Sequence, residues 1–161
     1  MSSQSIAAQI VASLNASGVK DFLLSPGARS QALALAAEQL ERAGLARLTV
    51  RLDERSMAFT GLGIANASKK PVALIVTSGT AVANLFPAVM EAYHSGTPLI
   101  LLTADRPARL RDAGANQTTN QVNVFGFAAP CFDLGIETSE SSAAEVALNA
   151  LQQALIDRRP V

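Results

Sequence analysis

Short apolar runs alternate along the chain with longer segments in which apolar residues recur every three to four positions. The short runs predict buried strands at residues 22–24, 48–51, 72–76 and 98–103. The longer segments predict helices that contain residues 6–14, 31–42, 54–67, 80–94 and 143–156. One further strand is expected at residues 131–136. Because strands alternate with helices, the pattern predicts an α/β three-layer sandwich, a parallel sheet with helices on both faces.

Polar residues follow each of the first four strands, at positions 25–29, 53–55, 77–80 and 104–107. In a parallel sheet the carboxyl ends of the strands share one edge, so these clusters are expected to converge on a ligand site. The turn at residues 77–80 offers backbone N–H groups and hydroxyls suited to an anion or a polar ring, although an ordinary helix N-cap explains it equally well.

Two features near these strand ends carry further expectations. Ser30 is expected to cap the helix that begins at Gln31. Residues 104–121 are polar, rich in arginine and hard to assign, and a loop of this length in a compact domain is usually functional or disordered.

Glu54 is the first residue of the predicted helix that follows the second strand. Residues 61–65 of that helix are small or apolar, which indicates that the helix is buried. A carboxylate that enters an apolar layer is costly unless something pairs with it. The alternative is an ordinary first-turn acid favoured by the helix dipole, and this stretch alone leaves both interpretations open.

The composition narrows the class of protein. The 161 residues are 49% hydrophobic and 16% charged, which predicts one well-packed domain. Lys plus Arg and Asp plus Glu number 13 each, so nothing favours nucleic acid or an anionic membrane as partner. Cys131 is the only cysteine, which favours a cytoplasmic location, and the apolar runs are too short for membrane insertion. The domain is expected to span residues 1–157, with residues 158–161 as the start of a linker.

Several familiar motifs are excluded. Gly61 and Gly63 superficially suggest a dinucleotide-binding fingerprint, but they lie inside a helix and lack the third glycine. His94 falls near the end of a predicted helix, where a contact with the helix dipole is the default interpretation. No cluster of His, Cys and carboxylates has metal-ligand spacing, so no metal ligand is expected within this chain.

Five segments occur in this order in a known family: residues 25–30, 53–56, 76–81, 102–107 and 114–118. On these residues the sequence resembles the N-terminal, pyrimidine-binding domain of the MenD family, thiamine-diphosphate-dependent transferases of menaquinone biosynthesis. The Ser-Gly-Thr turn and the glutamate are general to thiamine-diphosphate enzymes. The Asp-Arg-Pro and Gly-Ala-Asn-Gln stretches are more specific to this family.

The resemblance implies a reaction. Such enzymes decarboxylate 2-oxoglutarate on thiamine diphosphate and add the succinyl-semialdehyde carbanion to isochorismate. Glu54 falls on the glutamate that hydrogen-bonds N1′ of the aminopyrimidine ring and drives it to the imino tautomer. The resemblance places seven residues at the cofactor: Ser25, Pro26, Gly27, Thr77, Ser78, Gly79 and Thr80. It places four residues at the substrates: Arg29, Arg106, Asn116 and Gln117. Many family members have serine where this chain has Ala28, which puts one substrate contact in doubt.

The resemblance also implies what this chain lacks. In the family a separate C-terminal domain binds the diphosphate and Mg²⁺, and the cofactor lies between two subunits. The chain is therefore expected to be inactive alone and to act in a homo-oligomer, at least a dimer. Two alternatives stay open: the pyrimidine domain of another thiamine-diphosphate enzyme, and a non-catalytic α/β binding module.

Overall fold

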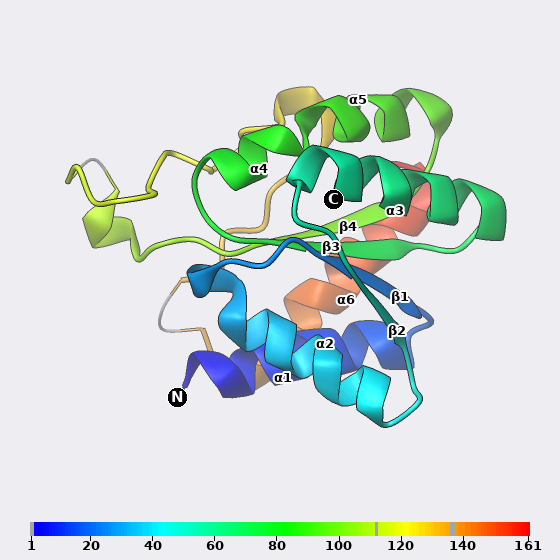
Figure 1. Cartoon of the computed structure of the whole chain (residues 1–161), viewed down its shortest axis with the longest axis horizontal. Coiled ribbons are helices and arrows are strands. Elements are labelled where there is room, and N and C mark those ends of the chain that lie inside the picture. Colours follow the sequence, from blue (N-terminus) through cyan, green and yellow to red (C-terminus); the bar gives the residue numbers. More distant parts are fainter. Residues whose placement is uncertain (1, 112, 136–137) are drawn as a thin grey trace.

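The computed structural model describes residues 2–111, 113–135 and 138–161, which form a parallel sheet between two layers of helices (Figure 1). The sheet of these residues has four strands in the order β2-β1-β3-β4, and every neighbouring pair is parallel. The strands are β1 (Asp21–Leu24), β2 (Arg47–Val50), β3 (Val72–Val76) and β4 (Leu99–Thr103). The predicted three-layer α/β architecture is confirmed.

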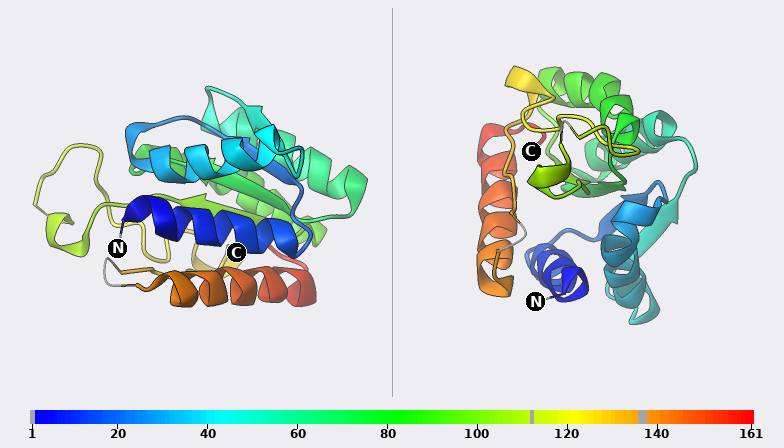
Figure 2. Two further views of the ribbon diagram at one scale, coloured as in Figure 1. Left: turned by 90° about the horizontal axis from the view of Figure 1, so that it is seen from below. Right: turned by 90° about the vertical axis from the view of Figure 1, so that its left-hand side faces the viewer.

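Two hydrophobic cores fill the spaces between the layers. Figure 2 shows the same layers in two further views. One core lies between the sheet and α3 (Glu54–Ser68), α4 (Thr80–Asn84) and α5 (Phe86–Ser95). The other lies between the sheet and α1 (Ser3–Ala16), α2 (Gln31–Arg42) and α6 (Glu140–Asp157). β3 contributes side chains to both cores, because its alternate residues point to opposite faces of the sheet. The first core contains Val72, Leu74 and Val76, and the second contains Ala73 and Ile75.

The predicted helix over residues 80–94 is wrong in one respect, because the structure divides it into α4 and α5 at Leu85. Pro87 explains the break. It has no backbone N–H to donate to the carbonyl of Ala83, and it stands in the first turn of α5, where a missing N–H costs nothing.

The expected strand at residues 131–136 is also wrong for the part that can be seen. Residues 131–135 are exposed and form no strand, and Ile136 lies outside the described residues. Such a strand would pair with the outer edge of β4, but Val161 forms backbone hydrogen bonds with this edge instead. The Val161 N–H donates to the Leu99 carbonyl (2.9 Å), and the Leu101 N–H donates to the Val161 carbonyl (2.7 Å).

This pairing makes Val161 a parallel neighbour of β4, with only 7% of its surface exposed. The segment from residue 158 to 161 thus packs against the domain at this point. A domain boundary at residue 157, with a linker beginning at 158, stays a prediction.

Gly61 sets the distance between α3 and the sheet. A Cβ at this position would lie 2.5 Å from Cδ2 of Leu74, which is fully buried in β3. Gly63, two residues further along the same helix, is exposed and has no heavy atom within 4 Å of its Cβ position. The two glycines therefore have different roles within one helix.

We predict that Gly61→Ala lowers the free energy of unfolding by about 1–2 kcal/mol. The energetic cost of forcing a methyl group into the packed core is larger than the stabilisation from the higher helix propensity of alanine. Gly63→Ala is the matched control and should raise the free energy of unfolding by about 0.5–1 kcal/mol. Urea denaturation of both variants makes the comparison. Equal effects at the two positions would contradict a close contact at Gly61.

Candidate functional site

The carboxyl ends of the four strands meet at one edge of the sheet, where the polar segment 104–121 extends from the body (Figure 1, yellow-green at the left). β1 and β3 are neighbours, but the chain leaves them in opposite directions, toward β2 and β4. Such a divergence opens a crevice in which open α/β sheets bind ligands. The candidate site is therefore centred on the loops that follow β1 and β3.

These two loops touch at Gly27 and Thr77. A Cβ at Gly27 would collide with the Thr77 side chain and lie 2.8 Å from its Oγ1. Thr77 is 5% exposed, and its hydroxyl oxygen is buried with no hydrogen-bond partner among the described residues. A buried hydroxyl without a partner is unusual, and it marks this spot as one where a polar ligand group would be satisfied.

Ser25 and Ser30 brace the loop that follows β1. The Ser25 hydroxyl is buried and donates to the Arg51 carbonyl at 2.9 Å, which ties the end of β1 to the end of β2. The expectation that Ser30 caps α2 is wrong, because its hydroxyl donates backward to the Gly27 carbonyl (3.1 Å). The short 3₁₀ turn Ala28–Ser30 brings that carbonyl within reach. Pro26 and Arg29 are exposed beside Gly27.

Glu54 begins α3, but the capping role belongs to its neighbour Asp53. Oδ1 of Asp53 accepts a hydrogen bond from the Ser56 N–H at 2.7 Å, and this bond holds the pKa of Asp53 below its usual range. The Glu54 side chain is half-buried, and within the described parts of the chain no hydrogen bond or ion pair engages its carboxylate. The carboxylate is thus available to a ligand, whereas Arg55 is exposed to solvent.

The turn after β3 is held by the distant loop. Ser78 Oγ donates to the Gln117 carbonyl (2.8 Å), and Nε2 of Gln117 donates back to the Ser78 carbonyl (3.1 Å). Gly79 has a left-handed backbone (φ 83°), and its N–H donates to Oε1 of Gln121 at 2.9 Å. Only part of the turn therefore offers the free donors expected from the sequence, and Thr80 is its exposed end.

A network of charges fixes the start of the loop after β4. The Arg111 guanidinium contacts Asp105 (2.9 Å) and Asp133 (3.0 Å). The hydrogen bonds from Arg111 hold the pKa of Asp133 below its usual range, and Asp133 in turn raises the pKa of Arg111. Oδ1 of Asp105 accepts from the Arg106 N–H (2.6 Å), so Asp105 anchors the residue that carries the candidate substrate-binding side chain.

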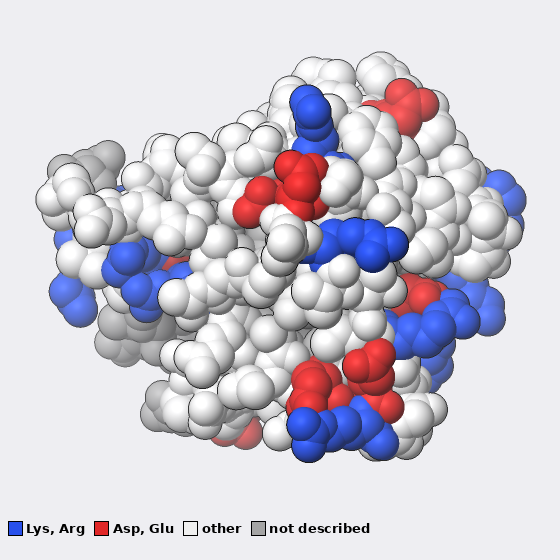
Figure 3. Space-filling model, viewed as in Figure 1, with Lys and Arg blue, Asp and Glu red and all other residues white. Residues whose placement is uncertain are grey.

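Positive charge gathers at this end of the molecule, where blue atoms outnumber red at the left of the space-filling view (Figure 3). Arg106 is half-buried, and its Nε atom is buried without a partner in the described part of the structure. Arg29 and Asn116 are exposed. The predicted site residues thus lie in loops that follow the strands, at the first positions of α3 and α4, or in the polar segment after β4.

The sequence predicted no role for three residues whose side chains hold these loops in place: Arg111, Gln121 and Asp133. Gln121 and Arg111 stand in the polar segment that the sequence singled out, so composition gave a signal for the region. The partners of Gln121 are 17 and 42 residues away in the sequence, and Asp133 is 22 residues away from Arg111, so no local pattern reveals these contacts.

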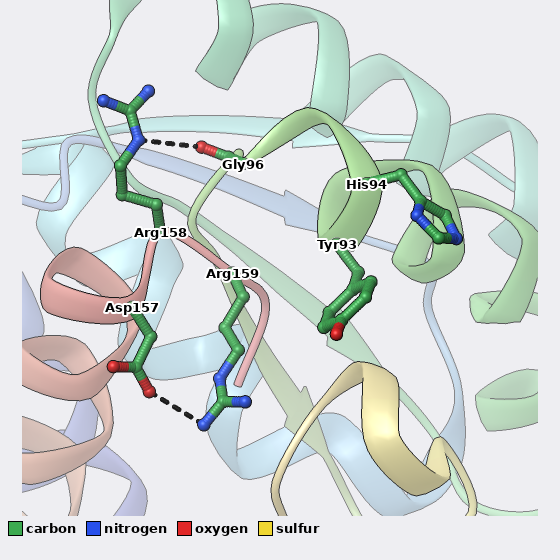
Figure 4. A pocket seen from close by; sticks show the side chains of 6 residues that line it. All are labelled: Tyr93, His94, Gly96, Asp157, Arg158 and Arg159. Carbon is green, nitrogen blue, oxygen red and sulfur yellow. Dashed lines mark hydrogen bonds and ion pairs between the residues drawn. The ribbon is translucent and has the colours of Figure 1, made fainter.

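A hollow of about 780 Å³ lies away from this edge (Figure 4). Its lining residues come from the ends of α5 and α6 and include Gly96, which precedes β4 and so belongs to the amino edge of the sheet. Its two arginines are engaged, Arg158 with the Gly96 carbonyl (3.4 Å) and Arg159 with Asp157 (2.7 Å). The hollow is separate from the candidate site.

The described residues contain no group of three or more His, Cys, Asp and Glu side chains that could hold a metal ion. In the same residues, no helix combines the length and the hydropathy that crossing a bilayer requires.

Comparison with known proteins places the site in a family context. Residues 4–124 match the family model described as "Thiamine pyrophosphate enzyme, N-terminal TPP binding domain". Relatives named 2-succinyl-5-enolpyruvyl-6-hydroxy-3-cyclohexene-1-carboxylate synthase come from several bacteria. The protein of Leifsonia xyli subsp. xyli is 49% identical over 91% of this chain and 26% of its own length. The protein of Clavibacter michiganensis subsp. michiganensis is 51% identical over 89% and 25%, and that of Nocardioides sp. is 45% identical over 96% and 29%. The chain thus spans about a quarter of the length of these relatives.

We predict that Asp53→Ala lowers the melting temperature by about 2–4 °C at pH 7, because it removes the cap of the helix that carries Glu54. Since the folded-state pKa of Asp53 is lowered, its contribution is present above its ordinary pKa of about 3.9 and disappears as the pH falls through the lowered value. Thermal melts at pH 7 and pH 3 should therefore show the gap between wild type and Asp53→Ala closing in acid. Asp53→Asn keeps an acceptor oxygen and should lie between the two at pH 7. A gap that does not change with pH would contradict the role of the charged cap.

Proposed function

The chain belongs to the thiamine pyrophosphate enzyme family, as an N-terminal TPP-binding domain, and on this premise we propose that it serves a 2-succinyl-5-enolpyruvyl-6-hydroxy-3-cyclohexene-1-carboxylate synthase. In that activity a succinyl group derived from 2-oxoglutarate, with loss of carbon dioxide, is joined to isochorismate. Synthases of this name that are 45–51% identical to most of the chain support the proposal. The observation that carries it is the Glu54 carboxylate, which stands without a protein partner in the described structure at the edge where the strand-end loops converge.

Glu54 is proposed as the catalytic residue. When bound, thiamine diphosphate supplies the electron sink that decarboxylation of a 2-oxo acid requires. Glu54 holds a proton at ring nitrogen N1′ of the aminopyrimidine and so fixes the tautomer of that ring. The half-buried Glu54 carboxylate suits this task, because no protein group in the described structure competes for its oxygens.

The loops after β1 and β3 are proposed to hold the pyrimidine ring. They suit a polar ring, because the Gly27 backbone lies close against the Thr77 side chain and the buried Thr77 hydroxyl has no protein partner in the described residues. The proposed cofactor contacts, besides Glu54, are Ser25, Pro26, Gly27, Thr77, Ser78, Gly79 and Thr80. Of these, the Ser25 hydroxyl acts by bracing the loop, since the Arg51 carbonyl already accepts its hydrogen bond.

The arginines of the site are proposed to bind the substrates, which are polycarboxylates. Guanidinium groups recognise carboxylates through paired, charge-assisted hydrogen bonds. Arg29 is exposed beside Gly27, and Arg106 is held at its backbone by Asp105, so the two stand in the loops that follow β1 and β4. Asn116 and Gln117 are proposed to complete the polar wall, and Gln117 already lies against the turn after β3.

The partners of the domain follow from the same proposal. The diphosphate and Mg²⁺ are proposed to bind to another domain of the complete, cytoplasmic enzyme, reached through a linker that starts at residue 158. A homo-oligomer, at least a dimer, is proposed to cover the apolar side chains exposed on α3, α5 and the turn Gly126–Ala128: Phe59, Phe86 and Phe127. Exposed apolar patches commonly mark interfaces, and a two-fold dimer is the commonest closed assembly.

The activity is tested by incubating the complete enzyme with thiamine diphosphate, Mg²⁺, 2-oxoglutarate and isochorismate and identifying the product by mass spectrometry. Formation of the succinylated cyclohexene carboxylate supports the proposal. Turnover of pyruvate in place of 2-oxoglutarate would instead assign the domain to another thiamine-diphosphate enzyme.

We predict that Glu54→Gln in the complete enzyme lowers turnover by about 10²–10⁴-fold, the usual contribution of a positioned acid–base group, without changing the melting temperature by more than a degree or two. Arg55→Gln is the matched control, because it changes the charge of the adjacent exposed residue, and its turnover should stay within about threefold of wild type. If Glu54→Gln also stays within threefold, Glu54 has no acid–base role.

We predict that residues 1–161 alone fold but bind thiamine diphosphate weakly or not at all and are inactive. The chain contains two complete cores, whereas the charged diphosphate and its metal carry most of the cofactor's binding energy. Circular dichroism should show a cooperative melt, and calorimetric titration with thiamine diphosphate and Mg²⁺ should show no micromolar binding. Micromolar affinity, or decarboxylation of 2-oxoglutarate by this chain alone, would contradict the division of the site between domains.

A further inference from the structure

Gln121 is one of the few buried polar side chains of the domain, with 6% of its surface exposed. Its Oε1 accepts from the Gly79 N–H at 2.9 Å, and its Nε2 donates to the Ala104 carbonyl at 3.1 Å. Gly79 belongs to the turn after β3, and Ala104 is the first residue after β4. One side chain therefore joins two strand-end loops of the candidate site.

The chemistry of these two contacts requires glutamine. Both partners are backbone groups of fixed polarity, an N–H on one side and a carbonyl on the other, so the side chain must accept at one end and donate at the other. A carboxylate would accept from Gly79 but would place a second oxygen against the Ala104 carbonyl. An apolar side chain of similar size would leave two backbone groups without partners, which is costly in a buried place.

Further contacts hold the two loops on either side of Gln121. Ser78 and Gln117 exchange a second pair of hydrogen bonds a few residues away, and Gln117 packs against Gly79 so closely that a Cβ there would lie 3.1 Å from its Cγ. Beyond Ala104, Asp105 accepts from the Arg106 N–H. A continuous set of contacts thus runs from the turn after β3, through Gln121, to the backbone that carries Arg106.

We propose that Gln121 is a positioning residue that fixes the turn at residues 77–80 relative to the loop at residues 104–106. The cofactor and the carboxylate substrates are thereby held in fixed positions relative to each other. This role rests on the function proposed above, in which the turn contacts the cofactor and Arg106 contacts substrate. Gln121 itself touches neither, and it acts through Gly79 and Ala104.

Two substitutions of Gln121 distinguish its contact with Gly79 from its contact with Ala104. Gln121→Glu keeps the acceptor for Gly79 and loses the donor for Ala104, so KM for 2-oxoglutarate and isochorismate should rise about tenfold while the concentration of thiamine diphosphate required stays within twofold of wild type. Gln121→Met loses both bonds, so the KM values and the cofactor requirement should each rise about tenfold. Equal effects of Glu and Met on all three quantities, or no effect of either, would overturn the coupling.

Gln153→Glu and Gln153→Met are the matched controls. Gln153 lies on α6, on the opposite side of the sheet from the core of α3 to α5, and the one hydrogen bond of its side chain in the described structure is to Asp157 at 3.5 Å. Both variants should keep the wild-type KM values and cofactor requirement. A tenfold effect here would mean that the assay reports general loss of stability, and the assignment to Gln121 would fail.

Hydrogen exchange of the Gly79 amide tests the contact without any activity. Exchange of this amide, measured by NMR on residues 1–161 if they fold alone or by mass spectrometry on the complete enzyme, should be about tenfold faster in Gln121→Met and within twofold of wild type in Gln121→Glu. An enzyme that fails to use 2-oxoglutarate and isochorismate would refute the proposed function but would leave this measurement interpretable. Unchanged exchange in Gln121→Met would refute the role of Gln121 even in an active enzyme.

Discussion

A strand that is buried on both faces must satisfy all its backbone hydrogen bonds inside the sheet, and β3 is the strand on which this constraint falls. All five of its residues are buried, and it pairs with β1 on one side and β4 on the other. Its alternate side chains divide the interior into two cores. The helices α3 to α5 pack on one face of the sheet around this strand, and α1, α2 and α6 pack on the other face. The turn at residues 77–80 is the direct continuation of β3 and inherits its fixed position.

The candidate site depends on this rigidity in a particular way. None of the strand-end loops is held by its own sequence alone. Ser25 reaches the backbone after β2, Gln117 and Gln121 reach the turn after β3, and Arg111 reaches Asp133. Against this braced background several groups of the site lack partners in the described structure, among them the Glu54 carboxylate, the Thr77 hydroxyl and Nε of Arg106. Unsatisfied groups among satisfied neighbours are the feature that distinguishes a binding site from an ordinary loop cluster.

The sequence predicted the sheet and most helices because their signals are local. Continuous apolar runs specify buried strands, and the helices begin and end near the residues that spacing and capping indicate. Pro87 was visible as a helix breaker, so the division of α4 from α5 was within reach of sequence reasoning. The expected strand is wrong at residues 131–135, and no local signal could reveal that Val161 occupies the edge of β4. The roles of Gln121 and Arg111 were hidden for the same reason, since both depend on partners far along the chain. The convergence of polar clusters on one edge could be predicted because parallel pairing alone imposes it.

The long sequence separation of the loop contacts has a consequence for the order in which the protein assembles. Ser78 and Gln117 are 39 residues apart, and Gly79 and Gln121 are 42 apart. Closing loops of this length costs entropy that a few hydrogen bonds do not recover until β3 and β4 already lie side by side. The binding edge is therefore expected to be the last part of the domain to form and the first to open under stress. Partly folded molecules would have a native sheet but no competence for ligand, so binding would report completion of folding more faithfully than secondary-structure content does.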